Sequence, residues 1–415
     1  MPSRTPDAHD LVFTGIGITT AVGQGRDAFL AALLDGSHAF GPMNRPGRQV
    51  PSAPTGPDGT GPAFLGAEIG ELAMPAAVPP RTLRTASLSA RAALATLDEA
   101  WTDAGLADVD PYRIGLVIGG SNVQQRELTQ LHARHAQQPE FLRPTYGMAF
   151  MDSDLCGLCT EVFPIRGFAH TLGGASASGL LAVLQAVRAV RSGQVDVCVA
   201  MGALMDLSYW ECLAFRAMGA MAPGDDPGAA CRPFDRDRAG FVYGEACGAV
   251  VIEREGARPG RAPYGRFLGG ATAMDGNRNP NPSLEGETRV LRGALREAGL
   301  TASAVDYVNP HGTGSRLGDE IELAALRECG LTDARINATK SITGHGLTAA
   351  GTVEVIATLL QMRAGVLHPT RNLLDPMDPS LPWVGAAAEP WAVETAVSLS
   401  MGFGGISSAI CLRTC

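Results

Sequence analysis

Residues 167–187 read GFAHTLGGASASGLLAVLQAV, a pattern that predicts a strand, a tight turn and a helix in direct succession. The run 168–172 is typical of a strand, small residues follow it, and an apolar helical pattern begins at once. Such a unit exposes one side chain at the amino end of a helix, as in turns that present catalytic nucleophiles. The side chain at the centre of this turn is Ser176, and no general base stands beside it in the sequence. A site built here therefore needs groups from other segments of the chain.

The rest of the chain alternates strand and helix patterns in two successive halves. RIGLVIGG and VDVCVAMGA have the pattern of strands in the first half, as do RFLGGATAMD, VDYVNPHG and AVSLSMGFGG in the second. Because the plan restarts after residues 257–265, we expect two halves, 1–256 and 257–415, in an α/β fold with largely parallel sheets. Their similar order suggests an internal duplication, although no residue-level repeat is obvious.

The bulk composition excludes several classes of protein. The chain has 415 residues, of which 45% are hydrophobic and 18% charged, as expected of a globular protein with a large core. Its net charge of −9 argues against nucleic acid or an anionic membrane surface as a partner. The first ten residues are polar, and no apolar run approaches the roughly 18 residues of a membrane span. We therefore expect a cytoplasmic protein.

The cysteines point to neither disulfides nor metal. The chain has nine of them, and an odd number in a chain of this length argues against a disulfide framework. Cys156 and Cys159 form a CxxC pair, but no second pair with metal-ligand spacing accompanies it. We expect buried, structural cysteines and no metal site.

Two histidines lie in glycine-rich turns of the second half. His311 belongs to NPHGTGSRLGDEIE, residues 309–322, and His345 to TKSITGHGLTAAGTVE, residues 339–354. Flanking glycines let backbone and ligand approach closely. Neutral imidazoles that donate N–H bonds stabilise an oxyanion or enolate, so both histidines could act on one carbonyl oxygen. Each could equally be a structural hydrogen-bonding group.

Lys340 lies five residues before the second of these histidines and is the only lysine in a chain with 33 basic residues. A lysine places a compact charge and shifts its pKa in ways that arginine cannot. A strong arginine bias usually reflects codon usage, so the single lysine could be a chance remnant. In a functional role, its ammonium group could be held by Glu354 or Glu322.

Four distinctive stretches follow one another along the chain: RPFDRDRAGFVYGEACGAVVIE, PHGTGSRLGDEIE, TKSITGHGLTAAG and MGFGGISS. They resemble the central signature, the first histidine motif, the lysine–histidine motif and the closing glycine-rich turn of the β-ketoacyl synthase family of the thiolase superfamily. The resemblance covers nearly the whole chain. It implies a thiolase fold with five layers, α-β-α-β-α, made of two duplicated halves. It also implies a homodimer, with residues 121–165 as one plausible contact.

Ser176 marks the main departure from the family, whose members carry a cysteine there that takes an acyl chain from a carrier protein. A helix dipole worth about 0.3–2 kcal/mol cannot turn a serine hydroxyl into an alkoxide, so we expect condensation to be crippled. The resemblance implies that His311 and His345 still hold the thioester oxygen while CO₂ leaves. Variants of this kind are similar to dedicated decarboxylases. We therefore expect an enzyme that converts a malonyl or methylmalonyl thioester on acyl carrier protein to the acetyl or propionyl thioester in polyketide biosynthesis.

The resemblance implies roles for further residues. The backbone N–H groups of Ser176 and Phe403 would form an oxyanion hole, with Phe403 also acting as a gate, and Lys340 would be catalytic beside the histidines. The implied supporting residues are Asp319, Glu322, Glu354 and Thr313. The substrate is expected on the phosphopantetheine arm of the acyl carrier protein, and the enzyme is expected to need no cofactor of its own and no metal.

Other departures lie along the expected pocket wall. Residues unusual for the family stand at five positions: Pro310, Thr348, Met401, Ile406 and Ser407. They leave the hydrogen-bond donors in place but change the expected tunnel for an acyl chain. This again disfavours condensation.

Two other functions remain compatible with the sequence. Ser176 could be a true nucleophile in an acyltransferase or condensing enzyme, with His311 or His345 as its general base. Alternatively, the chain could be a non-catalytic partner subunit of an active ketosynthase. Such a partner would be free to lose the histidines and Lys340, whereas this chain retains them. The motifs could also be structural glycine turns only.

Overall fold

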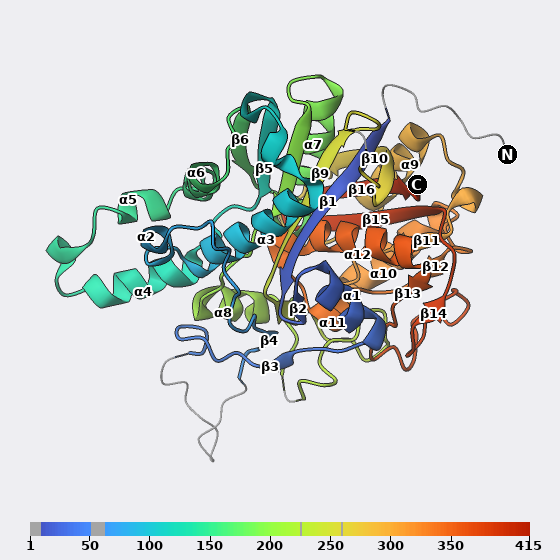
Figure 1. Cartoon of the computed structure of the whole chain (residues 1–415). Coiled ribbons are helices and arrows are strands. Elements are labelled where there is room, and N and C mark those ends of the chain that lie inside the picture. Colours follow the sequence, from blue (N-terminus) through green and yellow to red (C-terminus); the bar gives the residue numbers. More distant parts are fainter. Residues whose placement is uncertain (1–9, 51–62, 225, 259) are drawn as a thin grey trace, which may run out of the picture.

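The computed structural model describes residues 10–50, 63–224, 226–258 and 260–415. One long sheet runs through both halves of the chain (Figure 1). In the first half its strands are, in spatial order, β6 (Phe168–Leu172), β5 (Ile114–Gly119), β7 (Val197–Gly202), β9 (Ala246–Arg254) and β1 (Leu11–Thr20). The second half continues with β10 (Gly265–Met274), β16 (Ile406–Arg413), β15 (Thr395–Gly402), β11 (Tyr307–Asn309) and β12 (Arg335–Ile336). A short antiparallel pairing of β1 with β10 joins the halves.

The strand pairing of the first half is repeated in the second. β5 pairs in parallel with β6 and β7, and β9 runs antiparallel to β7 and β1. Likewise, β11 pairs in parallel with β12 and β15, and β16 runs antiparallel to β15 and β10. This repetition agrees with the predicted duplication. The expectation of largely parallel sheets was wrong for the middle strands, because connections such as the short turn between β15 and β16 reverse the chain.

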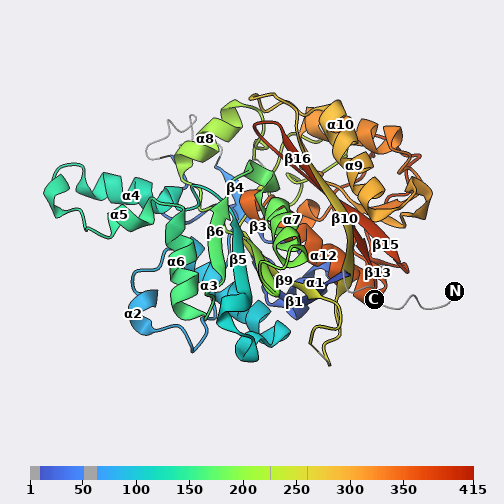
Figure 2. The same ribbon diagram turned by 90° about the horizontal axis from the view of Figure 1, so that it is seen from above.

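Helices divide the molecule into five layers (Figures 1 and 2). Two of them, α7 (Ser178–Arg191) and α12 (Ala350–Ala364), pack on each other between the two halves of the sheet. Every residue of α12 from Ala350 to Met362 is buried, as expected of a helix covered on all sides. The outer layers contain α3 (Leu88–Ala104) on the first half, and α9 (Leu284–Ala298) and α10 (Arg316–Glu328) on the second. The predicted division after residue 256 falls between β9 and β10, and it stays a prediction.

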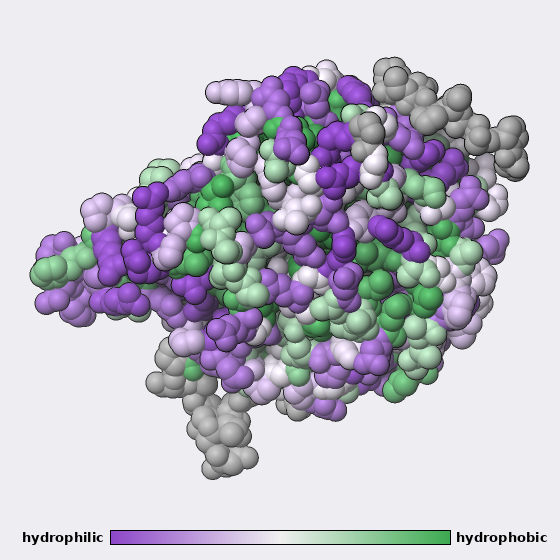
Figure 3. All heavy atoms as spheres, in the orientation of Figure 1, coloured by the Kyte–Doolittle hydropathy of each residue, from purple (hydrophilic) through white to green (hydrophobic). Residues whose placement is uncertain are grey.

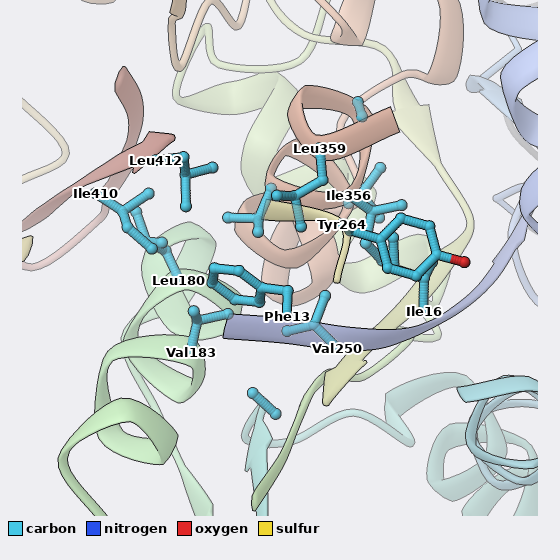
Figure 4. Close-up of a cluster of buried hydrophobic side chains, with 14 of the residues drawn as sticks. Phe13, Ile16, Leu180, Val183, Val250, Tyr264, Ile356, Leu359, Ile410 and Leu412 are labelled. Carbon is cyan, nitrogen blue, oxygen red and sulfur yellow. The ribbon is translucent and has the colours of Figure 1, made fainter. Parts of the chain in front are cut away.

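The largest group of buried side chains lies around the central helices. Figure 4 shows members of this group from β1, α7, β9, α12 and β16 pointing toward one another: Phe13, Leu180, Val250, Ile356 and Ile410. Burying one such side chain contributes roughly 1.5–3 kcal/mol. On the other face of β1, the backbone of α3 approaches so closely that a Cβ at Gly17 would lie 1.9 Å from the Thr96 carbonyl oxygen. Only glycine fits there.

Shorter elements surround this frame. The helices among them are α1 (Arg26–Asp35), α2 (Pro80–Leu83), α4 (Gln125–His135), α5 (Tyr146–Ala149), α6 (Ser153–Val162), α8 (Tyr209–Ala217) and α11 (Lys340–Thr343). The short strands are β2 (Gly23–Gln24), β3 (Phe40–Pro42), β4 (Leu65–Ala67), β8 (Tyr243–Gly244), β13 (Val366–Leu367) and β14 (Glu389–Pro390).

A segment that includes α4 and α5, residues 125–151, projects from the body of the molecule (Figures 1 and 2). We call this segment the arm. Large apolar side chains are exposed on it: Phe141, Met148, Phe150 and Met151. Figure 3 shows hydrophobic residues at its tip, beside hydrophilic residues along the rest of the arm. The arm lies within residues 121–165, for which the sequence predicts a contact between subunits.

The structure also bears on the predictions from composition. In the described parts of the chain, no helix combines the length and apolar character needed to cross a membrane. Residues 1–9, which contributed to the expectation of a cytoplasmic protein, lie outside the described residues. Cys156 and Cys159 are buried free thiols on α6, as predicted, and burial raises the pKa of both.

Candidate active site

A cavity of about 770 Å³ collects most of the predicted site residues. Its walls contain residues from the first histidine motif, the strand–turn–helix unit, the lysine–histidine motif and the closing turn: His311, Thr313, Asp319, Glu322, Ser176, His345 and Phe403. Lys340 and Glu354 lie behind this wall and are buried. The structure therefore brings together residues that are up to 227 positions apart, from Ser176 to Phe403.

Ser176 lies in the single-turn helix Ala175–Ala177, between β6 and α7, as the strand–turn–helix pattern predicts. The Ser178 hydroxyl closes this turn, because it accepts a hydrogen bond from the Gly174 N–H at 2.9 Å and donates to the Ala175 carbonyl at 2.7 Å. Ala175 adopts a φ of +47°, a conformation that costs energy for a residue other than glycine and is often found at functional sites. The neighbour that the local sequence lacks comes from the other half, because His345 Nε2 lies 2.9 Å from the Ser176 Oγ.

His311 is fixed through both its backbone and its ring. It follows β11 directly, and the Glu322 carboxylate accepts hydrogen bonds from its N–H at 2.5 Å and from the Gly312 N–H at 2.8 Å. The Lys340 Nζ is 3.3 Å from His311 Nδ1 and also donates to the His311 carbonyl. An ammonium group can only donate, so Nδ1 accepts and the ring proton of neutral His311 resides on Nε2.

His345 is held by backbone pairing with the segment around β8. Its N–H donates to the Val242 carbonyl at 2.7 Å, and its carbonyl accepts from the Gly244 N–H at 3.1 Å. The His345 ring meets the His311 ring nearly at a right angle, with centroids 5.4 Å apart, and it also packs edge-on against Phe241. Two imidazoles thus flank one small volume of the cavity.

Burial keeps both imidazoles neutral. It lowers the pKa of His311 well below its usual value, and the charge of Lys340, with that of His345 when His345 is protonated, lowers it further. The pKa of His345 is likewise lowered well below its usual value, first by burial and then by Lys340. Near pH 7 both rings are therefore uncharged, which suits hydrogen-bond donation to a developing negative charge.

Lys340 contacts Glu354 and not Glu322. Its Nζ forms a salt bridge with the Glu354 carboxylate while both side chains are buried. Burial raises the pKa of Glu354 to about 7, although Lys340 opposes that shift. The sequence left these two carboxylates as alternatives. The structure decides between them because Glu322 is already engaged by backbone N–H groups.

The remaining predicted residues stand around this centre. Asp319 accepts hydrogen bonds from the N–H groups of Phe234 (2.7 Å) and Gly314 (3.1 Å), so it shapes the turn that follows His311. Thr313 lines the cavity. Phe403, in the turn between β15 and β16, is 41% exposed and lines the cavity, a placement compatible with the implied gate.

Glu287 is a lining residue that sequence reasoning missed. It lies in α9, where Leu291, Ala294 and Leu295 are also buried. A glutamate in line with the apolar face of this amphipathic helix was a signal in the sequence that could have revealed it.

Comparison with known proteins identifies the family of the chain. The model of the β-ketoacyl synthase N-terminal domain matches residues 8–257, and the model of the C-terminal domain matches residues 264–374. The chain belongs to the β-ketoacyl synthase family. The resemblance noted from the motifs and the thiolase-like fold are thereby confirmed.

Individual relatives cover the chain almost completely. The polyketide biosynthesis malonyl-ACP decarboxylase PksF of Bacillus subtilis (strain 168) is 54% identical over 97% of this chain and 96% of its own length. The 3-oxoacyl-[acyl-carrier-protein] synthase 2 of Rhizobium meliloti (strain 1021) is 32% identical over 97% of this chain and 98% of its own length. Among solved structures, a β-ketoacyl synthase from Burkholderia phymatum STM815 is 26% identical with a TM-score of 0.85, over 98% of this chain and 99% of that one.

Proposed function

We propose that this chain decarboxylates a malonyl thioester carried on the phosphopantetheine arm of an acyl carrier protein in polyketide biosynthesis, acting in the cytoplasm, and releases the acetyl thioester without condensation. The observation that carries this proposal is that Ser176, in the nucleophile position, lines one cavity with His311 and His345, while Lys340 contacts His311 from behind the wall. The malonyl-ACP decarboxylase with 54% identity supports the same assignment. Methylmalonyl thioesters, which would give propionyl thioesters, belong in the same assay.

The mechanism follows from the two neutral imidazoles. The thioester oxygen accepts N–H bonds from His311 and His345. The bond from Cα to the carboxylate then breaks, its electron pair forms the enolate, and CO₂ leaves. The N–H bonds strengthen as charge grows on the oxygen. Water or a histidine returns a proton to Cα. The backbone N–H groups of Ser176 and Phe403 are the proposed oxyanion hole.

Ser176→Ala is expected to retain much of the decarboxylation, within about tenfold of the wild-type rate, because it removes one neutral hydrogen bond to His345 and no group that holds the enolate. The rate is measured as CO₂ release from malonyl-loaded carrier protein. A loss of activity as large as that of a histidine variant would contradict a non-nucleophilic Ser176. Ser176→Cys is the companion variant, and it is expected to gain slow self-acylation.

One distance favours a second candidate, a serine-dependent acyltransferase. The Ser176 Oγ lies 2.9 Å from His345 Nε2, within reach of a general base. Against this, the strongly lowered pKa of His345 makes its imidazole a poor base. Intact-mass analysis of malonyl-loaded carrier protein with the enzyme separates the candidates. Loss of CO₂ from the carrier with an unchanged enzyme mass supports the decarboxylase, whereas an acyl adduct on Ser176 supports the transferase. No change in either mass across several carriers supports the non-catalytic partner subunit.

We also propose that two copies of the chain form a homodimer through the arm and the neighbouring strand β6. β6 is the terminal strand of the sheet, and in the described residues no strand pairs with its outer edge. Exposed strand edges and apolar side chains favour pairing with another chain.

Met148→Glu combined with Phe150→Glu is expected to yield a monomer in light scattering after size-exclusion chromatography. Both side chains are exposed on the arm, so the monomer should still fold. Leu374→Glu is the matched control, since Leu374 is 82% exposed but lies outside the arm. A double variant that still elutes as a dimer would rule out the arm as the contact.

A further inference from the structure

Glu287 is a buried carboxyl group that no step above uses. It lies in the first turn of α9, which Ser283 caps by accepting a hydrogen bond from the Gly286 N–H at 3.1 Å. Its side chain lines the cavity, yet the residue is only 1% exposed. Its Oε2 atom is buried without a hydrogen-bond partner among the described residues. A buried polar atom of this kind usually has a partner, so its position at the cavity points to a ligand.

The surroundings of Glu287 favour the uncharged acid. Asp319 and Glu322, on the adjacent α10, are both satisfied by backbone N–H groups, and the Arg238 Nε lies 3.8 Å from Asp319. Asp275 and Arg316 also line the cavity, but no ion pair joins Glu287 to a cation in the part of the chain that the structure describes. Burial, Glu322 and Asp319 together raise the pKa of Glu287 well above its usual value. The first turn of α9 favours the charged form only modestly.

The position of Glu287 relates it to one part of the substrate. The first turn of α10 carries the exposed Leu317, which lines the cavity, and the helix continues through Glu322, which holds the His311 backbone. Glu287 lies on α9, which packs against α10, and Asp319 and Glu322 of α10 raise the pKa of its carboxyl group. A carrier-bound substrate must pass from the exposed rim to His311, so its phosphopantetheine chain passes the part of the cavity wall that contains Glu287.

We propose that Glu287, as an uncharged carboxylic acid, donates a hydrogen bond to an amide of the phosphopantetheine arm and so positions the thioester between the two histidines. The inference rests on the proposed function. A carboxylic acid presents one O–H donor and one C=O acceptor, which complement the C=O and N–H of a secondary amide. Ionisation of Glu287 removes the donor, so substrate binding weakens at alkaline pH.

The test compares Glu287→Gln with Glu287→Leu, using malonyl-pantetheine as substrate. The Gln variant keeps a donor and an acceptor but cannot ionise, whereas Leu keeps neither. We expect Leu to raise KM by about 3- to 10-fold at pH 7 with little change in kcat. The Gln variant should keep the wild-type KM at pH 7. Its KM should not rise at alkaline pH, whereas that of the wild type should. Glu285→Gln is the matched control, since Glu285 lies in the same turn but is exposed and paired with Arg289.

Each further outcome has a defined meaning. A KM that is unchanged in both variants, with the same pH profile as the wild type, overturns the inference. Acetyl-pantetheine, used as an inhibitor, shows whether Glu287 binds the pantetheine portion of the substrate or its malonyl carboxylate. Weaker inhibition of the Leu variant supports a contact with the pantetheine portion, and unchanged inhibition overturns the inference. If Leu fails to fold, the pH profile of Gln decides alone. A wild-type enzyme that releases no CO₂ from malonyl-loaded carrier protein refutes the proposed function itself.

Discussion

His345→Ala and His311→Ala each lower the rate of CO₂ release from malonyl-loaded carrier protein by about 10²–10³-fold, because each removes one N–H donor aimed at the enolate oxygen. The two rings flank the same volume, so the effects of the two substitutions should not add. The rate of the double variant should fall no further than the uncatalysed background rate. KM should change far less than kcat, since the donors act mainly as charge develops.

The control for this result is His38→Ala, which removes an exposed histidine outside the cavity. Its rate should equal that of the wild type. Thermal unfolding of the histidine variants shows whether the fold survives the loss of a buried ring. A folded His345→Ala or His311→Ala enzyme that retains a rate within tenfold of the wild type would refute the proposed mechanism.

Lys340→Met destabilises the protein by about 3–5 kcal/mol, because it leaves Glu354 buried without its ionic partner. The double variant Lys340→Met with Glu354→Gln removes the unpaired acid and should recover much of this loss in stability, but its rate of CO₂ release should stay below that of the wild type because Lys340 no longer contacts His311. The free energy of unfolding, measured with urea, checks the first expectation, and CO₂ release checks the second.

Removal of Lys340 is also expected to shift the pH profile of kcat in one direction. The charge of Lys340 lowers the pKa of both His311 and His345, so its removal raises both values. A histidine with a higher pKa becomes protonated at a higher pH, which moves the acid limb of kcat upward in pH for the double variant. An acid limb at its wild-type position would show that Lys340 does not act through the histidines.

Local sequence predicted the parts of the site but not their contacts. The turn at Ser176 was predictable because a strand pattern, small residues and a helix pattern follow one another directly. The backbone conformation of such a unit depends on near neighbours in the sequence. The turn carrying His311 was predictable for the same reason. The contact between Ser176 and His345 spans 169 positions, so no local pattern could reveal it. The pairing of Lys340 also stayed open, since two glutamates had suitable spacing.

The sequence by itself determined the order of the elements, the duplicated α/β plan and the retention of the two histidines and a lysine beside a serine. These properties depend on residue type, periodicity and glycine turns, all of which act over a few residues. Only the tertiary structure decided which strands run antiparallel, that Glu354 pairs with Lys340, that both imidazoles are neutral and that Glu287 faces the cavity. Burial and electrostatic contact depend on how distant segments pack, and a pKa is set by that packing and not by neighbours along the chain.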